Sequence, residues 1–443
     1  MTSLVTVREF AVLAAESGRT SDLDGASVSK ADFEWLAKCS QTLGLSGMPI
    51  TALTSPTTLR LSNYVGVLET PSGTRIEILP KHVAGVEDVQ EARALLRKMI
   101  ATALDLPKHA ATPTDLQVFS SPVCEWIIHS FLTETKQLLA RGLRSEYREI
   151  SSEERFIRGR LHAVRQLRQP PSRQHLAQVQ FDVFVHDRAE NRLIRSAVDA
   201  VLKVTKVPAS WRLAQEFRAR LHEIPFSPNF AEDFRAWRDD RLSASYAAVR
   251  PWCELILRTL LPVTVLGAWR GVSLLFPMEK LFERYVACWL REALDHRAKL
   301  HAPGSGESLC QHRGNSMFQL RPDLLVDAGG RRWVLDTKWK LLDGAAQEAK
   351  YGLSEADFYQ LFAYGSRYLA GREGELALIY PAAKGFQQAL PMFQFSDRLR
   401  LWVVPFDLRN DKLLMKPQTL QLPLSCELLP LEDPRGSPEC VRN

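Results

Sequence analysis

The sequence predicts a multidomain α/β protein with a small β-rich N-terminal domain, a mostly helical middle region and a C-terminal domain whose mixed sheet is flanked by helices. The chain of 443 residues is too long for a single hydrophobic core. Its composition, 45% hydrophobic and 24% charged, is that of a soluble globular protein. Changes in hydrophobic periodicity place the domains at residues 1–110, 111–262 and 263–430, and residues 431–443 are expected to form a disordered tail.

The N-terminal domain is predicted from short apolar runs separated by turn signals. Its expected elements are a helix at Ala31 to Leu43 and strands at Leu59 to Leu61, Tyr64 to Glu69 and Thr74 to Leu79. The first apolar run, Val5 to Ala14, fits either a strand or a short helix. Glu77, Lys81 and His82 show no catalytic spacing, so we expect them at a solvated strand end.

The middle region combines helical patterns with a concentrated basic tract. Apolar stripes predict helices at Val123 to Leu139 and Asp187 to Val204. From Arg141 to Arg173 there are nine arginines and four glutamates, an excess close to the net charge of +6 for the whole chain. Such local positive density favours contact with nucleic acid, although a charged interdomain face would show the same pattern. The candidate DNA-binding residues are Arg155, Arg158, Arg160 and, farther along the chain, Arg321.

Several classes of protein do not fit this sequence. The seven cysteines are scattered without a C-x-x-C pair, which argues against a disulfide framework or a zinc site and fits a reducing cytoplasm. Cys310 and His312 could form half of a metal site, but no second half follows. Arg8 and Glu9 interrupt the first apolar run, so it is no signal peptide. The longest apolar stretch, Leu255 to Met278, is broken by arginines and a proline, so no membrane span is expected.

The C-terminal domain is predicted from alternating helices and strands. Its expected elements are a helix from Phe276 to about Ala298, hairpin strands at Leu324 to Val326 and Trp333 to Leu335, a helix from Asp357 to Leu369, and strands at Leu376 to Tyr380 and Leu401 to Pro405. Ser354 and Asp357 resemble a capping box at the start of the second helix. The stretch His301 to Arg313 is predicted to be a loop. A strand reached across a helix usually runs parallel to the preceding strand, which makes the sheet mixed.

The predicted hairpin carries the residues best suited to catalysis. The turn signal Ala328-Gly329-Gly330 separates its strands. Because side chains alternate along a strand, Asp336 and Lys338 share one face. Asp323 enters the preceding strand directly after Pro322. Two carboxylates and an ammonium suit Mg²⁺-dependent phosphodiester cleavage, in which oxygen ligands hold the metal and a lysine positions the attacking water. Alone, a D-x-K triplet is more often part of an ordinary hairpin.

Motifs on both sides of the hairpin extend this set. Glu283 lies on the preceding helix, and Gln360 and Tyr364 lie one turn apart on the following helix. Together with Pro322-Asp323 and Asp336-Thr337-Lys338, their order resembles the PD-(D/E)xK nuclease superfamily with a trailing Q-x-x-x-Y motif. Within that superfamily, the chain is similar to the McrC family of nuclease subunits from McrBC-type modified-cytosine restriction systems. The resemblance covers nearly the whole chain and includes Ile76-Glu77-Ile78-Leu79-Pro80-Lys81, Arg158-Gly159-Arg160-Leu161, the helix containing Asn191, and Phe282-Glu283.

This resemblance implies a restriction-endonuclease-like C-terminal core and a role for each site residue. Asp323 and Asp336 would hold one or two Mg²⁺ ions, and Lys338 would be the catalytic lysine. Glu283 would be an auxiliary acid, with Glu279 one turn away as the other candidate. Support of the site or of the scissile phosphate would come from Gln360 and Tyr364.

The resemblance also implies partners and a division of labour. The chain would be the DNA endonuclease subunit of a type IV restriction complex in the cytoplasm. Its N-terminal domain would bind a hexameric AAA+ GTPase that it stimulates, and its substrate would be double-stranded DNA containing modified cytosine. Because the sequence has no G-x-x-x-x-G-K-[ST] loop, another polypeptide must supply any NTP-driven step. Two alternatives remain: a stand-alone or repair-type nuclease of the same superfamily, and a DNA-binding subunit that mainly regulates a GTPase.

Overall fold

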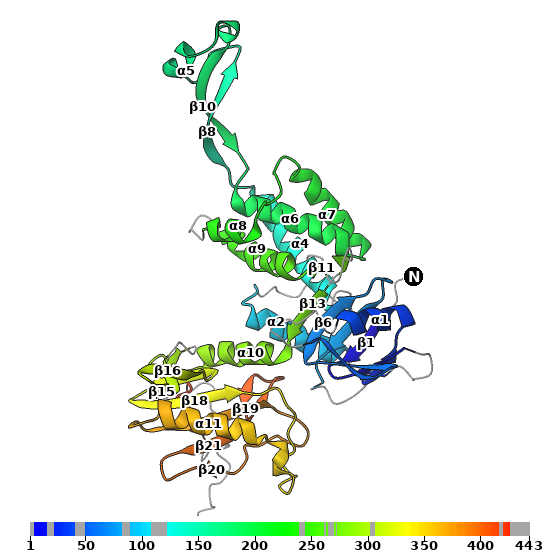
Figure 1. The fold of residues 1–443 in the computed structure, drawn as a ribbon, viewed down its shortest axis with the longest axis vertical. Coiled ribbons are helices and arrows are strands. Elements are labelled where there is room, and N and C mark those ends of the chain that lie inside the picture. Colours follow the sequence, from blue (N-terminus) through cyan, green and yellow to red (C-terminus); the bar gives the residue numbers. More distant parts are fainter. Residues whose placement is uncertain are drawn as a thin grey trace, which may run out of the picture.

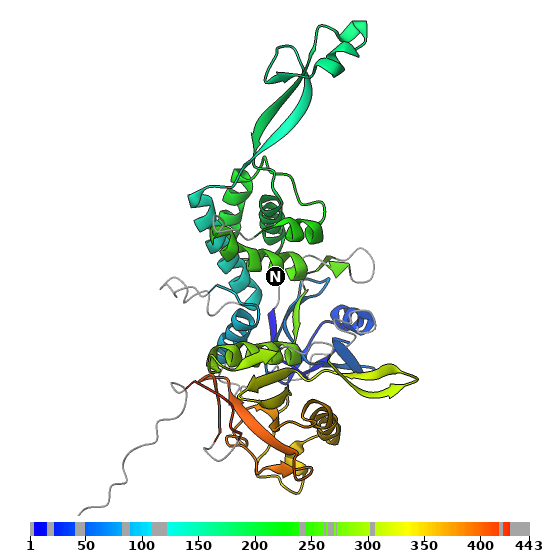
Figure 2. The ribbon, with the colours of Figure 1, turned by 90° about the vertical axis from the view of Figure 1, so that its left-hand side faces the viewer.

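The computed structural model describes residues 4–15, 22–39, 49–81, 89–107, 122–238, 244–260, 263–264, 270–271, 273–301, 306–415 and 420–425. Figure 1 shows an N-terminal unit, a helical middle region that carries a long arm, and a C-terminal sheet with its helices. In both ribbon views the arm extends away from the rest of the molecule (Figures 1 and 2). The mixed α/β architecture is therefore confirmed, whereas the predicted tail at 431–443 lies outside the described residues.

The N-terminal unit contains two small sheets packed around one core. The first sheet has the order β1 (Leu4–Arg8), β7 (Arg75–Leu79), β6 (Tyr64–Glu69) and β13 (Ser273–Pro277). The second has the order β3 (Gly25–Ser27), β2 (Val12–Ala14), β5 (Thr58–Leu61) and β4 (Thr51–Ser55). Helix α1 (Lys30–Cys39) contributes Phe33 and Leu36 to the shared core. The ambiguous first apolar run forms two strands because the chain turns at Phe10, whose φ is 64°.

Strand β7 is buried on both faces, and this overturns one expectation. Glu77 was expected at a solvated strand end, but its exposed fraction is 0%. Its carboxylate accepts hydrogen bonds from the guanidinium of Arg93 at 2.6 to 3.2 Å. Arg93 lies on α2 (Val89–Ala103), which covers the sheet, so the charged pair joins a strand to a helix inside the core. His82 lies outside the described residues.

Strand β13 comes from far along the chain. It pairs antiparallel with β6, with Leu275 opposite Gly66. The sequence placed these residues in the C-terminal domain, whereas they complete the N-terminal sheet. Helix α10 (Met278–Ala293) follows β13 directly and packs against α2. The helical middle region is thus inserted between α2 and β13.

The middle region is largely helical, as predicted. Its longer helices are α4 (Val123–Arg141), α6 (Ala189–Val204), α7 (Pro208–Arg220), α8 (Phe230–Ala236) and α9 (Ala244–Leu255). Their apolar stripes meet in a core that includes Phe131, Val198 and Trp252. Within the described part of the chain, no helix has both the length and the apolar character needed to cross a membrane.

Residues 146–185 form the arm, a long hairpin rather than part of the helical series. Its strands are β8 (Glu146–Glu154) and β10 (Ala177–Val185), and its tip carries β9 (Arg160–Leu161) and α5 (Ala163–Leu167). Most side chains along the ribbon are exposed or half-buried. The sequence of β8 lacks the apolar alternation by which a strand is recognised, whereas Phe181 to Val185 within β10 is an apolar run that predicts a short strand.

The C-terminal sheet carries the predicted hairpin and is mixed, as expected. Its order is β14 (Lys299–His301), β17 (Leu324–Ala328), β18 (Arg331–Thr337), β19 (Gly374–Pro381), β21 (Arg400–Asp407) and β20 (Phe393–Gln394), with β22 (Lys412–Leu413) beside β21. Gly329 and Gly330 form the hairpin turn with φ of 56° and 81°, a conformation that glycine adopts without strain. Helix α11 (Glu355–Tyr368) connects β18 to β19, and the two strands are parallel.

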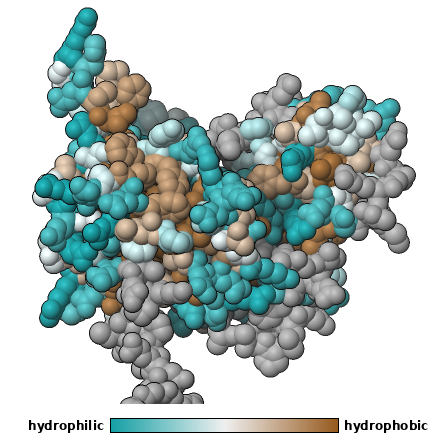
Figure 3. Space-filling view, turned by 90° about the horizontal axis from the view of Figure 1, so that it is seen from below, coloured by the Kyte–Doolittle hydropathy of each residue, from teal (hydrophilic) through white to brown (hydrophobic). Residues whose placement is uncertain are grey.

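Each face of this sheet packs against a different helix. Trp333 and Leu335 of β18 share a core with Phe282 of α10, whereas Val334 shares a core with Leu361 of α11. Figure 3 shows the molecule from the end opposite the arm, where apolar patches lie among hydrophilic side chains. Because side chains alternate between the two faces of β18, each later residue of the strand points either towards α10 or towards α11.

The predicted loop His301 to Arg313 is partly wrong. Its second half forms β15 (Glu307–His312), which pairs with β16 (Asn315–Leu320) in a two-stranded ribbon. All but one residue of β16 is exposed, so this hairpin also lacked an apolar signature. Strand β16 leads directly into the Pro322-Asp323 segment.

Candidate functional site

Asp336 lies at the end of β18 on the face that turns towards α11. It follows Val334 by two residues, so the two side chains point the same way. Leu335 and Thr337 point towards α10 instead. Asp336 is only 1% exposed. A carboxylate this deeply buried requires charged or hydrogen-bonding neighbours.

Asp323 is fixed by the residue next to Asp336. It stands just before β17, and its Oδ2 accepts hydrogen bonds from the backbone N–H and the Oγ1 hydroxyl of Thr337, both at 2.7 Å. The antiparallel pairing of β17 with β18 brings these two strand ends together. The two aspartates predicted as metal ligands thus lie at the same end of the hairpin.

Lys338 joins the strand end to helix α11. Its backbone N–H donates to the carbonyl of Ile379 at 2.9 Å, which extends the pairing with β19. Its Nζ lies 2.7 Å from Asp336 Oδ2 and donates to Gln360 Oε1 at 3.1 Å. The expected sharing of one face by Asp336 and Lys338 agrees with this contact.

Gln360 and Tyr364 link the strand end that carries Lys338 to the segment that carries Asp323. Gln360 Nε2 donates to the Tyr364 hydroxyl at 2.6 Å, and that hydroxyl donates to the carbonyl of Arg321 at 2.9 Å. A chain of hydrogen bonds therefore runs from Lys338 to the backbone two residues before Asp323. This chain positions the lysine and the aspartate relative to each other.

Asp357 is a further site residue that the sequence interpretation missed. Its Oδ1 lies 3.8 Å from Lys338 Nζ, and its Oδ2 accepts from the Tyr380 hydroxyl at 3.2 Å. Ser354 is the N-cap residue, as predicted, but its side chain makes no capping hydrogen bond, so the expected capping box is not formed. The available signal was spacing: Asp357, Gln360 and Tyr364 recur at i, i+3 and i+7, which is one face of a helix.

The site has more negative than positive charge. Burial raises the pKa of Asp336, the charge of Asp323 raises it further, and the ammonium of Lys338 opposes both. Burial alone would lower the pKa of Lys338, but the nearby carboxylates, Asp336 foremost, raise it overall. Three carboxylates thus act on one ammonium. Such a group of side chains favours the arrival of a further cation.

The donor set fits Mg²⁺. In the part of the chain that the structure describes, no three His, Cys, Asp or Glu side chains are grouped so as to enclose a metal. Asp323 and Asp336 provide two carboxylates at one strand end. Mg²⁺ commonly takes one or two protein carboxylates and completes its octahedron with water and substrate phosphate oxygens.

Glu283 is not joined to this group. Its carboxylate pairs with Lys280 Nζ at 2.7 Å, on the α10 side of the sheet. Hydrogen bonding to Glu283 is the main cause that raises the pKa of Lys280, and the charge of Asp323 adds to it. Glu279 lines a cleft that also contains Lys338. The geometry therefore leaves the choice of auxiliary acid between Glu279 and Glu283 open.

The predicted DNA-binding arginines lie in two places. Arg155, Arg158 and Arg160 are exposed near the tip of the arm, and Arg158 lies over the ring of Phe181 at 4.4 Å. Arg321 is exposed beside the site, where its guanidinium donates to Gln319 Oε1. The arm tip lies far from the C-terminal sheet in both ribbon views.

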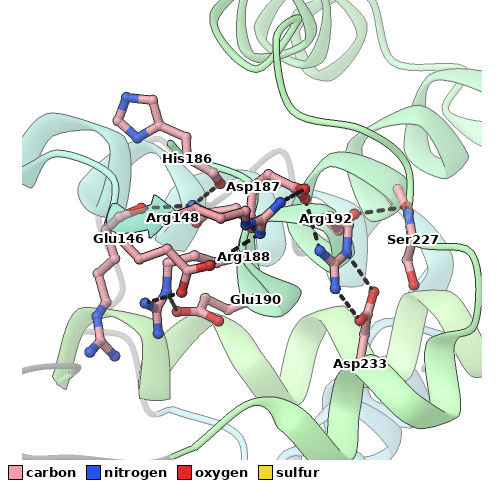
Figure 4. Close-up of polar contacts among 12 residues, drawn as sticks. Glu146, Arg148, His186, Asp187, Arg188, Glu190, Arg192, Ser227 and Asp233 are labelled. Carbon is pink, nitrogen blue, oxygen red and sulfur yellow. Dashed lines mark hydrogen bonds and ion pairs between the residues drawn. The ribbon is translucent and has the colours of Figure 1, made fainter. Parts of the chain in front are cut away.

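Other charges of the basic tract anchor the arm to the helices (Figure 4). Arg148 pairs with Glu146 at 3.1 Å and with Asp187 at 2.8 Å. Asp187 also pairs with Arg192 of α6 at 2.8 Å, and Glu146 with Arg188 at 3.0 Å. This network gives Arg148 a structural role at the base of the arm. Fewer arginines of the basic tract are therefore free to contact phosphates.

Comparison with known proteins gives a consistent result. Residues 59–381 match the family model of the McrBC 5-methylcytosine restriction system component. The fold is similar to a chain of the refined half-complex of Thermococcus gammatolerans McrB AAA+ hexamers with bound McrC, with a TM-score of 0.67 and 19% identity over 91% of this chain and 95% of that chain. A chain of the cryo-EM structure of the Thermococcus gammatolerans McrBC complex matches with a TM-score of 0.47 and 20% identity, over 65% of this chain and 87% of that chain. No curated protein matches.

Proposed function

Because the chain belongs to the family of McrBC 5-methylcytosine restriction system components, we propose that it is the Mg²⁺-dependent DNA endonuclease subunit of a modification-dependent restriction complex. The observation that carries this proposal is the meeting of Asp323, Asp336 and Lys338 at one strand end. Their order along the chain, with Gln360 and Tyr364 on the next helix, is that of a PD-(D/E)xK core. The mixed sheet between α10 and α11 suits such a core.

The residues of the site have separable tasks in phosphodiester hydrolysis. Asp323 and Asp336 would hold Mg²⁺, which when bound supplies Lewis-acid activation of water and neutralises charge on the scissile phosphate. Lys338 would orient the attacking water and place positive charge near the phosphate. Gln360 keeps the ammonium of Lys338 in place. Tyr364 ties this helix to the backbone before Asp323.

We propose that the partner is a hexameric AAA+ GTPase, which the chain stimulates. The relative of similar fold comes from an assembly of McrB AAA+ hexamers with bound McrC. The partner would supply recognition of modified cytosine and movement along DNA, because the sequence here has no nucleotide-binding loop.

The arm is the surface best suited to this partner. Its tip exposes large apolar side chains, with Phe156 82% and Leu167 87% exposed. Ile157 and Val164 are exposed beside them. Exposed apolar groups on a projecting element favour a protein interface. The assignment of partner binding to residues 1–110 remains a prediction.

Reconstitution tests the proposal as a whole. The chain and the AAA+ GTPase of the same system, mixed with GTP and Mg²⁺, are expected to cut DNA that contains modified cytosine. Omission of either protein, of GTP or of Mg²⁺ should stop cleavage, and addition of the chain should raise GTP turnover. Cleavage of unmodified DNA by the chain alone would favour the stand-alone nuclease instead. Stimulated GTP turnover without any cleavage would favour the regulatory subunit.

The arm gives a more local prediction. Phe156→Ser combined with Leu167→Ser is expected to weaken stimulation of the GTPase by about 10-fold or more, because apolar anchors at the centre of an interface carry most of its energy. GTP turnover measured as a function of chain concentration provides the readout. Trp211→Ser, an exposed apolar residue on α7, is the matched control and should leave stimulation at the parent level. Equal stimulation by the double variant and the control would exclude the arm tip from the interface.

A further inference from the structure

A cleft of about 540 Å³ separates the N-terminal unit from the end of the catalytic hairpin. One wall comes from the N-terminal sheets and the other from the segment after β18. Lys338 and Asp357 of the candidate site line it, so the cleft opens onto the catalytic lysine. The other lining residues used below are Phe10, Arg60, Lys81, Glu279, Trp339 and Lys340.

Three cationic side chains from different segments meet in this cleft. They are Arg60 of β5, Lys81 after β7, and Lys340 two residues beyond Lys338. Among the described residues, none of the three forms an ion pair with a carboxylate. Arg60 Nε donates to the carbonyl of Phe10 at 3.3 Å, Lys340 Nζ donates to the carbonyl of Gly352, and Lys81 Nζ lies 4.2 Å from the centre of the Phe10 ring.

The cationic side chains in the cleft repel one another. Burial is the main cause that lowers the pKa of Lys81, and the charges of Lys340 and Arg60 lower it further, against the opposing effects of Glu9 and Glu279. Counting Lys338, four cationic side chains line the cleft with the carboxylates of Glu279 and Asp357. An anion placed there would gain from all the cations together.

The two walls are connected through one buried carboxylate. Glu9 Oε1 accepts from the backbone N–H of Lys81 at 3.0 Å and from the indole N–H of Trp339 at 2.7 Å. Trp339 directly follows the catalytic Lys338. The position of Lys81 is therefore fixed relative to the catalytic strand. This is the geometry expected of a subsite that must hold its ligand in register with the reacting bond.

We propose that the cleft binds the sugar–phosphate backbone of the DNA strand being cut, with Arg60, Lys81 and Lys340 neutralising phosphates next to the scissile one. This inference rests on the proposed nuclease function and extends it to residues of the N-terminal unit. Phosphate contacts position a strand without reading its sequence, so this subsite adds register and affinity rather than base preference.

The salt dependence of DNA binding tests the subsite. The full chain with Asp336→Asn, which is expected to suppress cleavage, is titrated into a labelled duplex without its partner at several salt concentrations. Adding Arg60→Gln and Lys340→Gln is expected to lower affinity by about 10-fold and to reduce the slope of log K against log salt by about two, because each substitution removes one neutralised phosphate. The charge-preserving pair Arg60→Lys and Lys340→Arg should retain the parent slope.

A matched pair on the middle helices controls for net charge. Lys203→Gln with Arg220→Gln removes two exposed cations that lie away from the cleft, and it should leave the affinity and slope unchanged. If Arg60→Gln with Lys340→Gln has no larger effect than this control, the cleft does not hold the strand. If the slope falls as expected while Asp336→Asn still cuts DNA in the reconstituted complex, the subsite stands and the catalytic assignment fails. The two hypotheses are thus distinguishable.

Discussion

Asp336→Asn is expected to reduce DNA cleavage by the reconstituted complex by about 10²- to 10⁴-fold, the range seen when a positioned catalytic or charge-stabilising group is removed. The substitution keeps the shape of the side chain but removes the charge that pairs with Lys338 and would bind the metal. Lys338→Ala and Asp336→Ala should abolish cleavage in the same way. Initial rates of strand scission at saturating Mg²⁺ measure the effect.

A measurement of partner binding distinguishes a variant that has lost catalysis from one that has lost its fold. Stimulation of the GTPase should persist in Asp336→Asn because the arm lies far from this strand end. Asp327→Asn provides a matched control on the same hairpin. That carboxylate pairs with Arg332 at 2.7 Å, outside the site, and its loss should leave cleavage within a few-fold of the parent. Parent-rate cleavage by Asp336→Asn would show that the site has been assigned to the wrong residues.

The largest loss of stability is expected from Arg93→Ala. This change leaves the carboxylate of Glu77, which is 0% exposed, without its guanidinium partner. Breaking one side of a buried ion pair typically costs about 3–5 kcal/mol, because the remaining charge stays desolvated. Denaturant unfolding of the N-terminal unit, monitored by hydrogen exchange of its strands, gives the change in its free energy of unfolding.

Two further variants serve as controls for this stability measurement. Glu77→Leu with Arg93→Met removes both charges and should recover much of the stability, since well-packed apolar pairs often match buried ion pairs. Arg220→Ala breaks an exposed pair with Glu216 and should cost less than about 1 kcal/mol. A similar small loss for Arg93→Ala and Arg220→Ala would mean that the Glu77 pair contributes little.

Local patterns were enough to predict the hairpin that carries the candidate site. The two glycines of its turn and the period-two alternation of β18 specify both the fold of the segment and the shared face of Asp336 and Lys338. The helices with clear apolar stripes, such as α4 and α6, were predicted for the same reason. In each case the information lies within about 20 neighbouring residues, where periodicity operates.

Features that depend on distant pairing could not be predicted this way. The partner of β13 lies on β6, and no local pattern identifies it. Arg60, Lys81 and Lys340 meet only because three segments fold together. Asp357 was hidden for a different reason: its position three residues after a serine also fits a helix cap. A residue that satisfies a common structural pattern gives no separate signal that it lies beside the candidate site.

The pairing of β13 with β6 also affects how the chain folds during its synthesis. A ribosome releases β6 roughly 200 residues before β13, and synthesis at ~5–20 residues per second leaves that edge of the N-terminal sheet uncovered for tens of seconds. The core of the middle region is continuous with α10 and the C-terminal sheet, so it too is incomplete during this interval. The sheet, and with it the wall of the cleft that faces Lys338, is completed only when α10 begins to emerge. Asp323, Asp336 and Lys338 all follow β13 in the sequence, so the candidate site can form only after this strand has been made.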